Sequence, residues 1–78
     1  KPIWLVDIAI EEHQPKHVSM NPHLLETFDV FWRAGYRAWT AQAVPREVER
    51  AEVAAIVQTG RDTLGTHNFL FAEANPLA

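Results

Sequence analysis

The apolar segment IWLVDIAI at residues 3–10 constrains the possible folds more than any other part of the chain. Every position except Asp7 carries an apolar side chain, so in an extended strand these side chains would fall on both faces. Such strands are typical of the interior of an α/β sheet, where helices cover both faces and other strands pair with both edges. We therefore predict that residues 3–10 form a central strand that is buried on both sides.

The rest of the chain predicts two helices and two more strands. Asn21-Pro22 is a typical helix start, because asparagine caps free backbone N–H groups and proline suits the first helical position. Gly35 is a typical helix end, since glycine readily adopts the left-handed conformation. The predicted elements are a helix from Asn21-Pro22 to Gly35, a strand over residues 36–40, a linker over 41–50, a helix over 50–59 and a strand over 67–72. The order is therefore β-α-β-α-β, which places the chain in the α/β class.

Size, charge and composition exclude several classes of protein. The 78 residues allow at most one domain. A net charge of −3 without a basic stripe argues against a nucleic-acid partner. No apolar run approaches the roughly 20 residues of a membrane-spanning helix, so we expect no membrane partner. The lack of cysteine excludes disulfides and thiolate zinc sites, and it is compatible with the cytoplasm, where we expect the protein.

Three strands make a thin sheet, and a strand as apolar as residues 3–10 needs neighbours on both sides. We therefore predict that residues 1–78 are a single partial domain, the C-terminal segment of a longer protein. On this prediction, the first partner of the chain is the missing N-terminal half of its own domain.

Polar side chains follow directly after the first strand, at Glu11, Glu12 and His13. In open α/β sheets, ligands bind outside the carboxyl ends of the parallel strands, which is where this cluster lies. His67 and Asn68 open the last predicted strand. If that strand runs antiparallel to the first, His67 approaches the same loop, where its imidazole could act as a general base.

Other polar residues leave alternatives open. Asp7 is held by a neighbouring segment, faces a solvated edge, or lies near a bound ligand, because an unpaired carboxylate is costly to bury. The side chains that could together bind zinc are Glu11, His13, His17 and His23. Their spacing does not match a helical pair such as H-E-x-x-H, so we predict no metal site.

A family resemblance rests on three segments of the chain, which are KPIWLVDIAIEEH, NPHLLETFDVFWRAGYRAWTA and THNFLFAE. Together they resemble the C-terminal part of FkbM-type S-adenosylmethionine-dependent methyltransferases, in the same order and over nearly all of the chain. The most specific parts are Gly35-Tyr36-Arg37-Ala38 and Asn68-Phe69-Leu70-Phe71. One departure is Asp7, where relatives commonly carry glutamate.

The resemblance implies a class I, Rossmann-like methyltransferase fold, whose seven-stranded sheet has an antiparallel last strand. It makes residues 3–10 the fifth strand, 36–40 the sixth and 67–73 the seventh, with the seventh between the other two. It also implies methyl transfer from S-adenosylmethionine to a hydroxyl group of a small molecule or sugar.

The cofactor-binding loop of that family follows the first strand of the fold, and this chain has no counterpart to it. The glycines are Gly35, Gly60 and Gly65, and their spacing forms neither G-x-G-x-x-G nor a P-loop. We therefore expect S-adenosylmethionine to be bound mainly by residues outside this chain, and we assign no cofactor-binding residue to it.

The resemblance and the position of the polar cluster together give the predicted roles. His13 and His67 are the candidate proton acceptors, and Glu11, Glu12 and Asn68 are the candidate substrate contacts. Two rival functions are kept: a standalone α/β interaction module that pairs through an exposed sheet edge, and a fragment of a metal-assisted hydrolase built on the histidine-rich loop.

Overall fold

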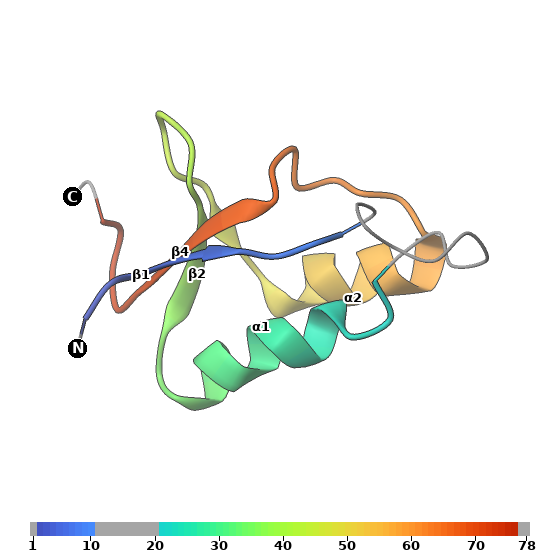
Figure 1. The fold of residues 1–78 in the computed structure, drawn as a ribbon, viewed down its shortest axis with the longest axis horizontal. Coiled ribbons are helices and arrows are strands. Elements are labelled where there is room, and N and C mark those ends of the chain that lie inside the picture. Colours follow the sequence, from blue (N-terminus) through green and yellow to red (C-terminus); the bar gives the residue numbers. More distant parts are fainter. Residues whose placement is uncertain (1, 11–20, 77–78) are drawn as a thin grey trace.

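The computed structural model describes residues 2–10 and 21–76 (Figure 1). Within them the chain forms two helices and a four-stranded sheet. The elements are β1 (Trp4–Asp7), α1 (Leu24–Arg33), β2 (Arg37–Thr40), β3 (Glu47–Val48), α2 (Arg50–Thr59) and β4 (Asn68–Ala72). Neither helix in this part of the chain is long and apolar enough to cross a bilayer.

The sheet has the strand order β1-β4-β2-β3, and each neighbouring pair is antiparallel. The last strand, β4, therefore lies between β1 and β2 and runs opposite to both, while β1 and β2 run in the same direction. Leu70 of β4 faces Leu5 on one side and Trp39 on the other. The predicted antiparallel last strand and its central position are both confirmed. The described part of the chain is a small mixed α/β structure with an antiparallel sheet, and it does not show a Rossmann-like methyltransferase fold.

The predicted linker over residues 41–50 is wrong, because it contains the short strand β3. Val48 is fully buried and pairs with Ala38, and Glu47 pairs with Trp39. The Arg37 guanidinium donates to the Glu47 carboxylate across this ladder, with an Nε–Oε2 distance of 2.8 Å. The observed order is therefore β-α-β-β-α-β. A strand of two residues is too short to give a period-two pattern in the sequence, which is why the linker was predicted.

The predicted start of the first helix is also displaced. Helix α1 begins at Leu24, two residues after Pro22, and Asn21 does not cap its first turn. The Asn21 side chain instead accepts a hydrogen bond from the His23 backbone N–H at 2.9 Å, which forms a turn before the helix. The predicted end is confirmed, because Gly35 follows the helix with a φ of 91°.

Strand β1 lies at the edge of the sheet that the described residues form, and the predicted central position, buried on both sides, is wrong for this part of the chain. Both helices pack on the same face of the sheet (Figure 1), and β4 pairs with only one edge of β1. Trp4 and Leu5 are consequently 49% and 69% exposed, and only Val6 of this strand is half-buried. Ile8 and Ile10, just beyond the strand, are buried in the core.

The hydrogen bonds between β1 and β4 determine which backbone groups of β1 point toward β4 and which point toward the open edge of the sheet. The Ile8 N–H donates to the His67 carbonyl oxygen at 2.8 Å, so Ile8 belongs to a hydrogen-bonded pair. Such pairs alternate along an antiparallel ladder. The backbone groups of Val6 therefore point toward β4, whereas those of Leu5 and Asp7 point toward the open edge.

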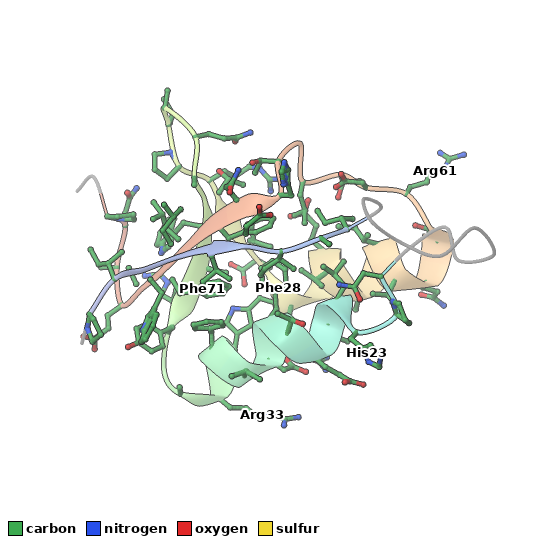
Figure 2. The ribbon with its side chains drawn as sticks, viewed as in Figure 1. His23, Phe28, Arg33, Arg61 and Phe71 are labelled. Atoms are coloured by element: carbon green, nitrogen blue, oxygen red, sulfur yellow. The ribbon has the colours of Figure 1, made fainter. Side chains whose placement is uncertain are left out.

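The core lies between the sheet and the two helices, and Phe28 of α1 is at its centre (Figure 2). Its ring lies 5.0 Å from the Phe69 ring and 5.6 Å from the Phe71 ring, centroid to centroid, and both partners belong to β4. Phe71 also stacks on Phe31 at 3.9 Å. These aromatic contacts attach α1 to the strand that joins β1 to β2.

The two helices are joined by an ion pair between Asp29 of α1 and Arg50 at the start of α2. The Arg50 guanidinium donates to both carboxylate oxygens, at 3.0 and 3.1 Å. This hydrogen bonding by Arg50 holds the pKa of Asp29 below its ordinary value. Asp29 is one of the few buried polar residues in the described part of the chain, so the pair satisfies a carboxylate that would be costly to leave alone.

We predict that Arg50→Gln makes the stability of the chain less sensitive to acid. A carboxylate with a lowered pKa in the folded state stabilises the fold above its unfolded pKa of about 3.9, and this contribution is lost as the pH falls through the folded value. The difference in unfolding free energy between the wild type and Arg50→Gln should be largest near neutral pH and shrink below about pH 4. Urea unfolding at neutral and acidic pH measures it.

Arg61→Gln is the control for that comparison, because its side chain extends into solvent away from both helices (Figure 2). Its unfolding free energy should follow the wild type at every pH. A difference between the wild type and Arg50→Gln that is the same at both pH values would contradict the role given to Asp29.

Candidate functional site

The candidate site lies where the carboxyl end of β1 meets the start of β4. Asp7, the last residue of β1, faces Asn68, the first residue of β4. One residue further on, the Ile8 N–H donates to the His67 carbonyl oxygen. The antiparallel register therefore brings two segments that are sixty residues apart in sequence to the same corner of the sheet.

His67 and Asp7 form a hydrogen-bonded pair at this corner. The His67 Nδ1 atom lies 3.0 Å from the Asp7 Oδ1 atom. Both side chains are open to solvent, with exposed fractions of 46% for His67 and 69% for Asp7. The prediction that His67 lies beside the end of the first strand is confirmed. Of the alternatives for Asp7, the structure shows a carboxylate that a neighbouring segment contacts at a solvated edge.

The turn before β4 is shaped by short-range hydrogen bonds. The Asn68 N–H donates to the Thr66 hydroxyl at 3.1 Å, and the Leu64 N–H donates to the Asp62 carboxylate at 2.8 Å. The Asn68 carbonyl oxygen accepts from the Ala41 N–H at 3.0 Å. The backbone of Asn68 is thus fixed on both sides, while its half-buried side chain lies next to Asp7 in the ladder.

Three of the predicted site residues, Glu11, Glu12 and His13, lie outside the described residues, as does His17 of the metal alternative. Their proposed place at the rim of the site stays a prediction. His23 is described, and it lies at the start of α1 with its side chain directed into solvent (Figure 2). Its Nδ1 atom is 3.3 Å from the Glu26 carboxylate, one helical turn away.

The described side chains offer no metal centre and no cofactor cavity. Residues 2–10 and 21–76 contain no group of three histidine, aspartate or glutamate side chains arranged to hold a metal ion. No pocket opens among them either.

The arrangement at the corner can accept a proton. When a neutral imidazole donates its Nδ1–H to a carboxylate, its Nε2 atom carries the free lone pair. Within residues 2–10 and 21–76, the structure gives the Nε2 atom of His67 no hydrogen-bond partner. The sequence reasoning identified both residues but not their contact, because the contact depends on the register between two strands.

Searches of protein-family profiles, of characterised proteins and of solved structures find no match to this chain.

Proposed function

We propose that this chain is the C-terminal α/β part of an S-adenosylmethionine-dependent methyltransferase that methylates a hydroxyl group of a small molecule or sugar. The observation that carries the proposal is the position of β4. It lies between β1 and β2 and runs antiparallel to both, as the resemblance to FkbM-type methyltransferases implies for the seventh strand between the fifth and the sixth. The chain would supply one edge of the sheet and a wall of the substrate pocket.

The proposed role of His67 is to accept the proton of the substrate hydroxyl, with His13 as the second candidate. A hydroxyl oxygen becomes a better nucleophile as it loses its proton, and an imidazole held within hydrogen-bond reach can accept that proton. Glu11, Glu12 and Asn68 are the proposed substrate contacts. The position of His67 at the carboxyl end of β1 supports this assignment, since ligands of open α/β sheets bind at that end.

Under this proposal the methyl donor is held by the N-terminal half of the domain. The open edge of β1 supports such a partner, because the backbone groups of Leu5 and Asp7 point away from β4. Ile3 and Leu5 also expose apolar side chains at this edge, with fractions of 59% and 69%. A strand from the N-terminal half would pair with these groups and cover these side chains.

The experiment is a methyl-transfer assay on the product of the complete gene and on residues 1–78 alone. With labelled S-adenosylmethionine and a panel of sugars and small alcohols, the complete product should methylate an oxygen atom, and residues 1–78 should be inactive. Methylation by residues 1–78 alone, or a complete product that transfers no methyl group to any hydroxyl, would contradict the proposal.

The exposed edge of β1 also favours the second candidate function, a small interaction module without catalysis. Such an edge offers unpaired N–H and C=O groups to a strand of another molecule or of a second copy. A lysine at an edge position opposes this pairing, so Leu5→Lys is the discriminating variant. If Leu5→Lys abolishes a defined complex seen by size-exclusion chromatography, and the complete gene product transfers no methyl group, the interaction module is the better account.

A further inference from the structure

We infer that Asp7 is a positioning residue, which holds His67 in the Nδ1–H tautomer and so makes Nε2 the proton-accepting atom. This inference rests on the proposed function for the identity of the proton donor, a substrate hydroxyl. The contact from which it is drawn, between Asp7 Oδ1 and His67 Nδ1 at 3.0 Å, is a feature of the fold itself.

Backbone hydrogen bonds hold the main chain at His67 in place, independently of its side chain. Its carbonyl oxygen accepts the Ile8 N–H at 2.8 Å, which attaches it to the end of β1. The next residue, Asn68, is paired in the ladder with Asp7. His67 lies opposite Ile8, one register position from Asp7, and just before β4 begins, so its side chain reaches the Asp7 carboxylate from outside the regular ladder.

The contact determines which ring nitrogen of His67 carries the hydrogen. A carboxylate can only accept a hydrogen bond, so the hydrogen must be on the Nδ1 atom of His67. In the neutral imidazole the proton is then absent from Nε2, whose lone pair points away from Asp7. In the other tautomer the proton is on Nε2. The ring would then face a substrate as a hydrogen-bond donor and could not take its proton.

The proton transfer then balances simply. The substrate hydroxyl gives its proton to Nε2, and His67 becomes an imidazolium that keeps its Nδ1–H bond to Asp7. The carboxylate stabilises this positive charge without being protonated itself. The oxygen of the substrate retains the electron pair of the broken O–H bond.

Nitrogen-15 NMR of the imidazole groups tests the inference on residues 1–78, at a pH high enough that a further increase leaves the imidazole resonances unchanged. In the wild type, the His67 Nε2 resonance should lie at the unprotonated position and the Nδ1 resonance at the protonated one. In Asp7→Asn the amide can donate to Nδ1, so the two resonances should exchange positions. Asp7→Glu keeps a carboxylate and should restore most of the wild-type pattern.

His23 gives an internal control, because its Nδ1 atom also faces a carboxylate, that of Glu26, at 3.3 Å. Glu26→Gln should leave both His67 resonances unchanged. If His67 is predominantly in the Nε2–H form in the wild type, or keeps the Nδ1–H form in Asp7→Asn, the inference is wrong.

These outcomes do not depend on methyl transfer. A missing methyl-transfer activity in the complete gene product would remove the proposed function, while the tautomer of His67 decides the role of Asp7 by itself. The two failures are therefore distinguishable.

Discussion

Replacing Phe28 with alanine is expected to destabilise the chain by about 3–5 kcal/mol, the cost typical of removing a fully buried aromatic side chain. Phe28 has no exposed surface and contacts Phe69 and Phe71 of β4 as well as Trp32 of its own helix. Its removal would leave a cavity between α1 and the sheet. Small domains are stable by only about 5–15 kcal/mol, so the variant should lose a large part of its folded population.

Urea unfolding followed by circular dichroism measures this effect. Val30→Ala is the matched control, because Val30 lies two residues away on α1 and is 65% exposed. Its unfolding free energy should stay within about 0.5 kcal/mol of the wild type, as for most surface substitutions. A loss below about 1 kcal/mol for Phe28→Ala would mean that the helix does not pack on β4 as described.

The largest expected effect on activity belongs to His67→Ala in the complete gene product. A positioned general base contributes typically 10²- to 10⁴-fold to a rate, so turnover should fall by about that factor. Binding of S-adenosylmethionine should be unchanged, because the cofactor is expected to contact other residues. Steady-state kinetics with the acceptor found in the methyl-transfer assay measures the first effect, and equilibrium titration measures the second.

His23→Ala is the control for His67→Ala, since His23 lies at the exposed start of α1 and outside the proposed site. His13→Ala is the comparison that ranks the two candidate proton acceptors. If turnover is unchanged in both His13→Ala and His67→Ala, neither histidine takes part in the mechanism.

The sequence allowed much of the fold to be predicted where a pattern was long enough. Helix α2 has the predicted bounds, and Gly35 ends α1 through its positive φ. The apolar run within residues 67–72 was correctly predicted to be a strand, and Phe69 and Phe71 are fully buried. The strand β3 could not be predicted because its two residues carry no period.

The position of β1 was predicted wrongly for a physical reason. A strand with apolar side chains on both faces requires cover on both, but within residues 2–10 and 21–76 the two helices cover one face only. The apolar pattern thus indicates that other segments pack against this strand, but it does not indicate whether those segments belong to the same 78 residues. Leu5 is a side chain of this strand that the described residues leave exposed.

The candidate site was predictable as a location but not as a set of contacts. The polar residues at the end of the first strand and at the start of the last one marked the corner. The pairing of Asp7 with His67 depends on strand register, which is set by packing across the whole sheet rather than by either segment. Asp7 was therefore left with alternatives that only the register could resolve.

The measurement that tests the central claim most directly is the reading of the coding sequence that precedes Lys1. If this chain is the C-terminal part of a methyltransferase, that sequence should encode an apolar strand followed by a glycine-rich loop, and an acidic residue after the next strand. A start codon immediately before Lys1 would contradict the claim, because the chain would then be complete without any residues to hold S-adenosylmethionine.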